Sequence, residues 1–466
     1  MTAGDRADVA FGDPGALVGV HVVGIGGAGM SAIAVVLHAM GHTVTGSDLR
    51  SSGVTERLVG AGIHVDIGHR AANVGTAGLV TVSTAIAEDN PEVVEAHRLG
   101  IPVLTRSQAL AAVASLRRCI AVAGTHGKTT TASMLALMLV DAGMHPSFLI
   151  GGDLNEIGTN AVWDDGEWLV VEADESDESF LALVPDIAVV TNVEPDHLDH
   201  YGSFEAVRAA FEEFVLDARH RRVVGGDDPV AAEIGWATGA DMVGAAPEST
   251  YRMVDLDLAR SSLSFGLIGP DGAALGRLDV PVPGLHNAKN AAVAAAAALA
   301  AGAPFTAIAR ALARFAGVAR RFEFRGAANG VTFVDDYAHL PSEVRAALAA
   351  ARNGDWPRVV AVFQPHRYSR TAELGREFGP AFEDADVVVV TDVYGAGEAP
   401  MPGVSGQVVA DAVRQSLPQV PVLYVAGRSD LCQAVAAILQ PGDLCCTLGA
   451  GDLTSLPDEL MADPSW

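Results

Sequence analysis

A glycine-rich segment follows the predicted strand at residues 118–124 and opens a predicted helix. Its residues are Gly124, Thr125, His126, Gly127, Lys128, Thr129 and Thr130. Backbone N–H groups of such a loop and of the helix N-terminus can wrap a phosphate chain, with the lysine reaching the terminal phosphates and the threonine hydroxyl binding Mg²⁺. The strict pattern has a glycine at position 122, where this chain has Val122, so the loop is a variant. We predict nucleotide phosphate binding here, and a glycine-rich connection with an incidental lysine is the alternative.

Lysine is nearly absent from the rest of the chain. Lys128 and Lys289 are the only two lysines, so 28 of the 30 basic residues are arginine. Because lysine offers a compact ammonium and arginine a planar fork, a position that keeps lysine indicates a requirement for that shape, with chance retention as the alternative. The rarity of lysine supports a chemical role for Lys128.

Polar residues also follow two later predicted strands. Glu172 comes after the apolar run at 168–171, and His197 comes after the segment 188–195. Their acidic neighbours are Asp174, Glu175, Asp177, Asp196 and Asp199. Transfer of a γ-phosphate requires groups that hold a metal ion beside the phosphate loop. We predict that Thr129, Glu172 and His197 bind Mg²⁺, and a solvated acidic turn is the alternative.

A second glycine motif follows the predicted strand at 18–24 and opens a helix. It consists of Gly24, Gly26, Gly27 and Gly29, and Asp48 lies 19 residues after the last of these, at the end of the next predicted strand. This spacing matches a dinucleotide-binding fingerprint, but a UDP-linked substrate presents the same diphosphate as NAD. We therefore predict a pyrophosphate-bearing ligand, with tight strand-to-helix packing as the alternative.

A third candidate site follows the apolar stretch at 358–364. His366, Arg367 and Arg370 come directly after it, at the kind of strand end where parallel sheets bind ligands. The planar fork of arginine can bind both oxygens of a carboxylate. We predict a carboxylate ligand here, and an exposed pair of arginines is the alternative.

The elements that position these residues alternate between short β-branched runs and helical segments, which predicts an α/β fold with parallel sheets. Three such series divide the chain into predicted domains at 1–106, 107–317 and 318–466. A length of 466 residues itself predicts two to four domains.

The composition is that of a folded, acidic protein. Hydrophobic residues make up 50% of the chain and charged residues 19%, which is enough apolar material for buried cores. The net charge of −27 disfavours nucleic acid or an anionic membrane as a partner, so an anionic ligand requires a local site. The four cysteines have no metal-binding spacing, and no stretch resembles a secretory leader or a membrane span. We expect reduced cysteines and a cytoplasmic location.

Nine ordered segments together resemble the Mur ligase family over nearly the whole chain. They are GIGGAGMS at 24–31, STAIAEDNPE at 83–92, GTHGKTTT at 124–131, EADESD at 172–177, NVEPDHLDHY at 192–201, GLHNAKN at 284–290, GVARRFE at 317–323, DDYAHLPSE at 335–343 and FQPHRYSRT at 363–371. The last two resemble the alanine-adding branch of the family. The resemblance implies a Rossmann-like N-terminal module for a UDP-sugar, a central P-loop-type ATPase, and a Rossmann-like C-terminal module for an amino acid.

The resemblance also implies a reaction. With ATP and Mg²⁺, L-alanine would be ligated to the lactyl carboxylate of UDP-N-acetylmuramate through an acyl phosphate, releasing ADP and phosphate in peptidoglycan precursor synthesis. It implies a monomer or homodimer whose partners are these small molecules.

Further residues receive roles only from the resemblance. Lys128, Glu172 and His197 would act in catalysis, Asn290 would contact adenine, Arg321 a phosphate and Asp336 the ribose. The UDP-sugar would be bound by the four glycines of the first motif with Ser47, Asp48, His69 and Ser83, and the amino acid by His339, His366, Arg367 and Arg370. The family pattern has a second histidine after His339, where this chain has Leu340, so any hydrogen bond from that ring is missing.

Three other functions fit parts of the sequence. An NAD-dependent dehydrogenase would use Gly24 and Asp48 but leaves Lys128 unexplained. A regulatory P-loop ATPase would leave both flanking modules without a role. The nearer rival is another amide ligase of the same family, which would add a different amino acid or act on a glutamylated acceptor.

Overall fold

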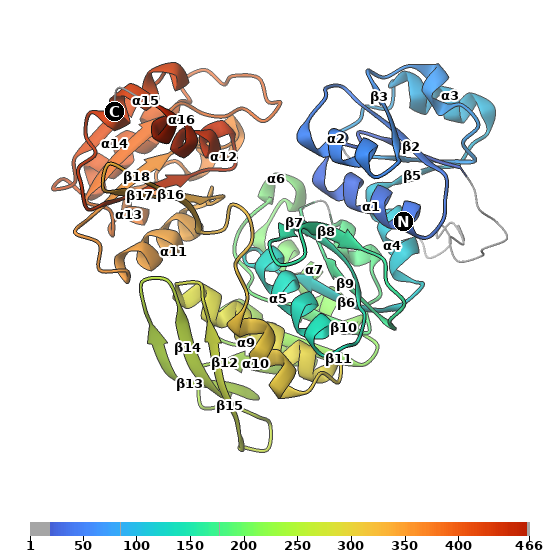
Figure 1. Ribbon diagram of the computed structural model, residues 1–466, viewed down its shortest axis with the longest axis horizontal. Helices are drawn as coiled ribbons and strands as arrows, with labels where there is room; N and C mark the ends of the chain where they lie inside the picture. Colours follow the sequence, from blue (N-terminus) through green and yellow to red (C-terminus); the bar gives the residue numbers. More distant parts are fainter. Residues whose placement is uncertain (1–18, 84, 177, 464–466) are drawn as a thin grey trace. The chain divides into compact units, whose positions relative to one another are not determined.

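The computed structural model describes residues 19–83, 85–176 and 178–463. Asp177, one of the acidic neighbours of Glu172, lies outside the described residues. The described chain forms three β-sheets flanked by helices, which confirms the predicted α/β fold class (Figure 1). Within these ranges, no helix is both long enough and apolar enough to cross a membrane.

The first sheet has five parallel strands in the order β3-β2-β1-β4-β5. Its strands are β1 (Val20–Val23), β2 (Val44–Asp48), β3 (His64–Ile67), β4 (Leu79–Val82) and β5 (Val103–Thr105). Its helices are α1 (Ala28–Ala39), α2 (Gly53–Gly60), η1 (Ala71–Val74), α3 (Pro91–Leu99) and α4 (Arg106–Ala114). The strand order reverses between β1 and β4, and ligands of such sheets bind at the carboxyl ends of the strands at that point. The first glycine motif begins there.

The second sheet has ten strands in the order β15-β14-β13-β12-β11-β10-β6-β9-β7-β8. β6 (Arg118–Ala123) pairs in parallel with both β10 (Ile187–Val190) and β9 (Trp168–Glu172). Five of the six residues of β6 are buried, as expected for a central strand that is covered on both faces. The lysine-containing loop follows β6 and opens α5 (Lys128–Asp141). It therefore lies at the carboxyl end of β6, whose neighbours in the sheet are β9 and β10.

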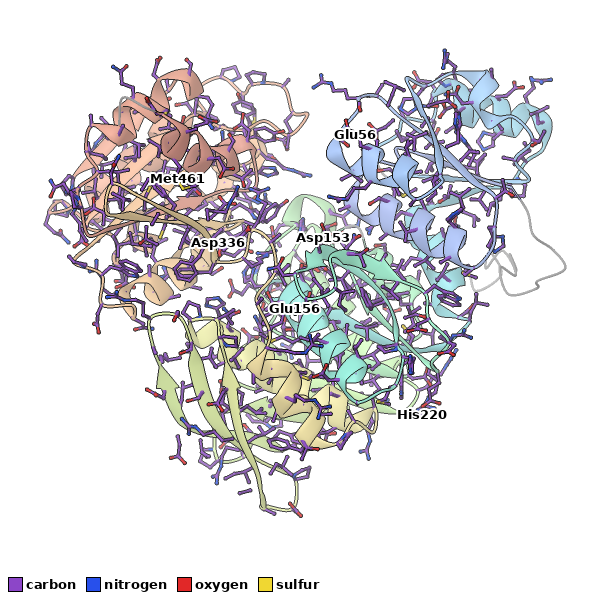
Figure 2. The ribbon with its side chains drawn as sticks, viewed as in Figure 1. Glu56, Asp153, Glu156, His220, Asp336 and Met461 are labelled. Atoms are coloured by element: carbon purple, nitrogen blue, oxygen red, sulfur yellow. The ribbon has the colours of Figure 1, made fainter. Side chains whose placement is uncertain are left out.

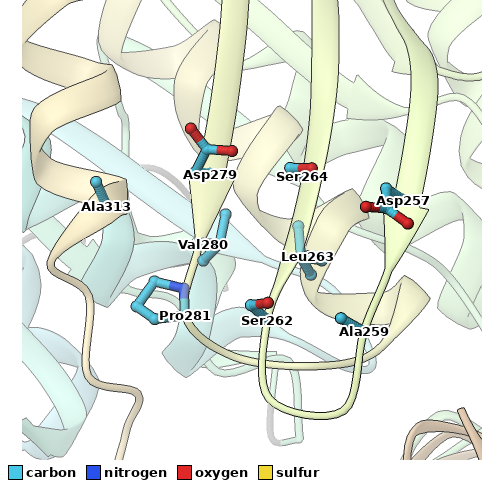
Figure 3. A pocket seen from close by; sticks show the side chains of 9 residues that line it. All are labelled: Asp257, Ala259, Ser262, Leu263, Ser264, Asp279, Val280, Pro281 and Ala313. Atoms are coloured by element: carbon cyan, nitrogen blue, oxygen red, sulfur yellow. The ribbon is translucent and has the colours of Figure 1, made fainter. Parts of the chain in front are cut away.

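The remaining elements of this region complete the second sheet and its helices. The strands are β7 (Ser147–Leu154), β8 (Thr159–Val162), β11 (Arg221–Gly225), β12 (Asp241–Gly244), β13 (Tyr251–Leu258), β14 (Leu263–Ile268) and β15 (Ala274–Val280). The helices are η2 (Ser179–Ala182), α6 (Leu198–Tyr201), α7 (Phe204–Leu216), α8 (Pro229–Thr238), α9 (Leu285–Ala300) and α10 (Phe305–Ala313). Residues of β13, β14 and β15 line a pocket of about 190 Å³ (Figure 3). None of the predicted site residues lines it.

The third sheet has six strands in the order β16-β17-β21-β18-β19-β20, and all pairs are parallel except β16 with β17. The strands are β16 (Glu323–Ala328), β17 (Val331–Asp336), β18 (Arg358–Phe363), β19 (Val387–Thr391), β20 (Val422–Val425) and β21 (Asp443–Leu448). The helices are α11 (Pro341–Arg352), α12 (Tyr368–Leu374), α13 (Phe378–Ala381), α14 (Gly406–Ser416), α15 (Arg428–Ala436), η3 (Asp452–Ser455) and α16 (Leu456–Ala462).

Candidate active site

The loop after β6 is formed by backbone that leaves no room for side chains at its two glycines. Gly124 and Gly127 have positive φ values of 135° and 79°. A side chain at Gly124 would collide with Thr191, and one at Gly127 would collide with Asn290. The structure therefore brings the predicted adenine contact, Asn290, next to the predicted phosphate loop.

Residues that follow β10 hold this loop from one side. The Thr191 hydroxyl donates to the carbonyl of His126 at 2.5 Å, and the Asn192 side chain both donates to that carbonyl and accepts from the His126 N–H, at 2.9 and 2.8 Å. The Glu194 N–H donates to the Thr125 hydroxyl at 2.9 Å. These three supporting residues were missed by sequence reasoning, although they directly follow a predicted strand.

The Lys128 side chain folds back against its own loop. Its Nζ donates to the carbonyls of Gly124 and Thr125 at 2.6 and 3.2 Å and lies 2.8 Å from Glu175 Oε1. Burial alone would lower the pKa of Lys128, but the carboxylates of Glu175 and Asp174 raise that pKa above its usual value. Lys128 is therefore a cation whose counterion is Glu175, a residue that sequence reasoning did not single out.

Glu175 is itself almost fully buried, with 3% of its surface exposed. This burial raises the pKa of Glu175 to about 7, against the lowering effect of the Lys128 ammonium. The Tyr201 hydroxyl donates to the Glu175 carbonyl at 2.6 Å, which fixes the backbone at this position. The pair thus keeps the Lys128 ammonium beside the loop, next to a carboxyl group that burial makes easier to protonate.

Two of the three predicted metal ligands are in contact. The Thr129 hydroxyl donates to Glu172 Oε1 at 2.9 Å, and the other oxygen of Glu172 accepts from the Gly151 N–H at 2.6 Å. His197 has a positive φ of 54°, and its Nε2 lies 3.3 Å from Asp196 Oδ2. The structure thus joins Thr129 to Glu172, while His197 pairs with its neighbour in sequence. Thr130 is buried in the first turn of α5.

The glycine motif of the first sheet is held by Asp48. Gly26 donates its N–H to Asp48 Oδ2 at 2.9 Å, and a side chain at Gly26 would clash with that carboxylate. Gly24 has a positive φ of 77°. A Cβ atom added at Gly24 would lie 3.2 Å from the Cβ of Ser83, so the two residues are close neighbours. Gly27 is the N-cap of α1, and Gly29 lies in the first turn. The predicted diphosphate residues therefore meet at the carboxyl edge of β1, β2 and β4.

Ser47 and His69 form a second group in this module, around a carboxylate that sequence reasoning missed. The Ser47 hydroxyl lies 3.0 Å from His69 Nδ1 and donates to Glu92 Oε2 at 2.5 Å. His69 Nδ1 lies 3.1 Å from the same oxygen. Burial alone would raise the pKa of Glu92, but the His21 ring 3.6 Å away and the hydrogen bonds from Ser47, Asn73 and Arg70 lower it to about 2. Glu92 is therefore a buried, ionised carboxylate.

In the third sheet, Asp336 is the last residue of β17 and is labelled in Figure 2. Its two oxygens accept from the N–H groups of Phe322 and Ala338 at 2.8 and 2.7 Å, and burial raises the pKa of Asp336 to about 6. Arg321 lies over the ring of Tyr337, with 5.2 Å between its guanidinium carbon and the ring centre. Asp336 thus anchors the segment that carries Arg321.

The predicted amino-acid residues gather near the ends of β17 and β18. The rings of His339 and His366 meet edge to face at 5.8 Å, and Arg370 Nη1 lies 3.5 Å from His366 Nδ1. Burial, followed by the charges of His339, Arg370 and Arg367, lowers the pKa of His366 to about 4. Arg367 is exposed and has a positive φ of 70°. The cluster is thus a neutral imidazole pair beside two permanent cations.

Leu340, which stands where the family pattern has a second histidine, lies at the start of a helix. Leu340 precedes α11 and is only 4% exposed. Glu343 accepts from the N–H groups of His339 and Leu340 at 2.9 and 3.2 Å, and so caps this helix. The residue is therefore a buried apolar side chain at a helix start.

Three family models match the chain in series. The Mur ligase family catalytic domain matches residues 19–118, the Mur ligase middle domain residues 122–298, and the Mur ligase glutamate ligase domain residues 320–451. The chain belongs to the Mur ligase family. It is accordingly an ATP-dependent, amide-forming ligase, which excludes the dehydrogenase and regulatory ATPase alternatives.

Individual relatives span nearly the whole chain. The UDP-N-acetylmuramate--L-alanine ligase of Geobacter sp. (strain M21) is 45% identical over 447 residues, covering 95% of this chain and 96% of that protein. The protein of the same name from Rubrobacter xylanophilus is 47% identical over 449 residues, covering 95% and 99%. The crystal structure of the UDP-N-acetylmuramate-alanine ligase from Thermotoga maritima has a TM-score of 0.81 at 29% identity, covering 95% of this chain and 98% of that chain.

Proposed function

We propose that this protein ligates L-alanine to the lactyl carboxylate of UDP-N-acetylmuramate, with ATP, in peptidoglycan precursor synthesis. The observation that carries the proposal is the match to ligases of that name at 45–47% identity over 95% of this chain. The carboxylate oxygen attacks the γ-phosphorus of ATP, which breaks the bond to ADP and forms an acyl phosphate. The alanine amine then displaces phosphate from the carbonyl carbon and loses a proton.

The loop after β6 binds the phosphates of ATP in this proposal. The positive φ values at Gly124 and Gly127 turn the loop, and the free N–H groups at the start of α5 favour an anion. Lys128 Nζ contacts two carbonyls and Glu175, and a phosphate oxygen is a stronger partner than a neutral carbonyl. We infer that the ammonium turns from these carbonyls to the phosphates when ATP binds.

Thr129 and Glu172 fit a Mg²⁺ site, because both offer hard oxygen ligands and already lie 2.9 Å apart. Mg²⁺ keeps several waters and commonly uses substrate phosphates as ligands, so two or three protein groups suffice. When bound, it would neutralise charge on the transferring phosphoryl group. His197 would join by leaving Asp196, its present partner at 3.3 Å.

The other two modules would hold the substrates that react. The glycine motif held by Asp48 would bind the diphosphate of the UDP-sugar, with Ser47, His69 and Ser83 nearby. Arg367 and Arg370 would bind the alanine carboxylate beside His339 and His366, because a neutral imidazole pair leaves the arginines as the cations of this cluster. We expect the enzyme to act in the cytoplasm as a monomer or homodimer.

Phosphate release from ATP tests the proposal directly. Activity should require both UDP-N-acetylmuramate and L-alanine, with glycine and L-serine as competing amino acids. UDP-N-acetylglucosamine is the matched control, since it shares the diphosphate and the sugar ring but lacks the lactyl carboxylate that attacks ATP. Activity that depended on a glutamylated acceptor, or that was indifferent to L-alanine, would favour a different ligase of the same family.

A further inference from the structure

One buried carboxylate in the first module accepts hydrogen bonds from four groups. Glu92 Oε2 accepts from the Ser47 hydroxyl at 2.5 Å and faces His69 Nδ1 at 3.1 Å. Oε1 accepts from the Asn73 amide at 2.5 Å and from the Arg70 N–H at 3.2 Å. The side chain of Glu92 has no exposed surface. The donors come from the end of β2, from the segment between β3 and η1, and from η1 itself.

The helix that carries Glu92 does not need this carboxylate for its own start. α3 has Asn90 as its N-cap, whose side chain accepts from the Glu92 N–H at 2.9 Å, and Pro91 at its first position. Burying a charge is costly unless several donors compensate it. The carboxylate therefore serves the groups that surround it more than the helix that carries it.

The arrangement determines where the protons lie on Ser47 and His69. An ionised Glu92 can only accept, so the single hydroxyl hydrogen of Ser47 goes to Oε2 over the shorter contact. His69 Nδ1 lies within 3.1 Å of two oxygens, Ser47 Oγ and Glu92 Oε2, and must therefore carry a hydrogen. Nε2 is then the ring atom left to meet a ligand.

A second histidine faces the same carboxylate from within the sheet. His21 Nε2 lies 3.6 Å from Glu92 Oε2, and its Nδ1 lies 2.9 Å from the Thr45 hydroxyl. His21 is fully buried on β1, so it cannot contact a ligand at the surface. It contributes to the fixed polar environment that keeps Glu92 charged and in place.

We infer that Glu92 is a positioning residue for the nucleotide-sugar site: it holds His69 in one tautomer and orientation, and Ser47 in one rotamer, without touching the ligand. The inference rests on the proposed function in one respect, the assignment of Ser47 and His69 to the UDP-sugar. The state of the His69 ring does not depend on that assignment and can be measured without any substrate.

The first test uses Glu92→Gln, which keeps the shape and the acceptor toward Asn73 but loses the charge beside His69. We expect KM for UDP-N-acetylmuramate to rise about tenfold, the effect of one or two weakened hydrogen bonds, with KM for ATP and L-alanine within twofold of the parent. Asn90→Ala is the matched control, because it weakens α3 itself. It should lower Tm while leaving KM for the UDP-sugar within twofold. An equal rise in Asn90→Ala would reduce Glu92 to a structural role.

The second test separates action through His69 and Ser47 from independent action. If Glu92 acts through these two side chains, Glu92→Gln should add less than twofold to the KM of an enzyme that carries both His69→Ala and Ser47→Ala, whereas independent effects would multiply. In the ligand-free protein, ¹⁵N-histidine NMR should show the Nδ1–H form of His69 in the parent and its loss in Glu92→Gln, with His69→Ala identifying the signal. An unchanged tautomer would overturn the inference. A parent that does not use UDP-N-acetylmuramate would overturn the proposed function instead, and the NMR result would still decide the role of Glu92.

Discussion

Replacing Lys128 with alanine removes a charge that acts at two places, the phosphates of ATP and the buried carboxylate of Glu175. Without an ammonium to stabilise the transferring phosphoryl group, we expect kcat to fall by roughly 10²–10³-fold or more. Removal of one partner from a buried ion pair costs roughly 3–5 kcal/mol, because the other charge stays buried and unpaired. The sequence alone predicts loss of turnover with an intact fold, and the 2.8 Å contact with Glu175 adds a loss of stability.

The stability loss should depend on pH. In the parent, burial raises the pKa of Glu175 from 4.5 to about 7, and removing the Lys128 cation would raise it further. A carboxyl group with a higher pKa in the folded state binds its proton more tightly there, so its contribution to stability declines as the pH rises from 4.5 through the folded pKa. We expect the Tm difference between parent and Lys128→Ala to be smaller at pH 6 than at pH 8.

Two further variants separate stability from catalysis. Adding Glu175→Gln to Lys128→Ala removes the unpaired charge, so thermal melts at pH 8 should recover much of the lost Tm while phosphate release stays as low as in Lys128→Ala. Lys128→Arg keeps the charge, but a planar fork does not fit a loop that holds a compact ammonium, so turnover should remain low. Near-normal turnover in Lys128→Arg would refute the phosphate role, and a Tm difference that ignored pH would refute the ion-pair reasoning.

Four other predictions concern the remaining sites. Glu172→Gln and His197→Ala should each raise the Mg²⁺ concentration for half-maximal activity and lower kcat, as expected for ligands of one metal. Full activity of either variant at unchanged Mg²⁺ would show that Glu172 and His197 belong to a structural turn and not to a metal site. The intact protein should bind UDP-N-acetylmuramate and not NADH at the Gly26 loop, which calorimetry with both ligands can check; tight NADH binding alone would reverse the assignment. Leu340→His should lower KM for L-alanine a few-fold to tenfold, the worth of one neutral hydrogen bond, at some loss of Tm because the site is buried. Arg367→Ala should nearly abolish activity, and an unaltered alanine KM and kcat would exclude its carboxylate role.

Residues whose type is dictated by backbone geometry could be predicted from the sequence. Gly124 and Gly127 adopt positive φ values and have no space for a side chain, so only glycine fits there. The spacing of these two glycines before Lys128 indicates a phosphate loop. The alternation of apolar runs likewise predicts parallel sheets. The order of the strands could not be predicted, because β6 lies between β9 and β10 through crossovers that leave no local pattern.

Side chains that act through a distant partner could not be predicted either. Glu175 is 47 residues from Lys128 and Glu92 is 23 residues from His69. Both lie in segments that resemble the family, but nothing in the sequence shows which of the chain's 57 acidic residues pairs with which base. Asp336 illustrates the converse. The resemblance implies a ribose contact, but both of its oxygens already hold backbone N–H groups, which gives it a structural task that a sequence motif does not reveal.

One physical device recurs in the first and central modules. Lys128 and His69, each predicted to meet a ligand, lie 2.8 and 3.1 Å from a buried glutamate, Glu175 and Glu92 respectively. The ligands expected at both are anions, which a glutamate cannot attract. A buried carboxylate instead restrains the basic group before the ligand arrives, and so reduces the conformational entropy lost on binding. What happens when the ligand binds differs between the two sites. A phosphate can draw Lys128 away from Glu175 and its loop carbonyls. His69 bonds its glutamate through Nδ1, so it can keep that bond and offer Nε2 to the ligand. The glutamates thus act as a releasable counterion in the central module and as a permanent orienting group in the first.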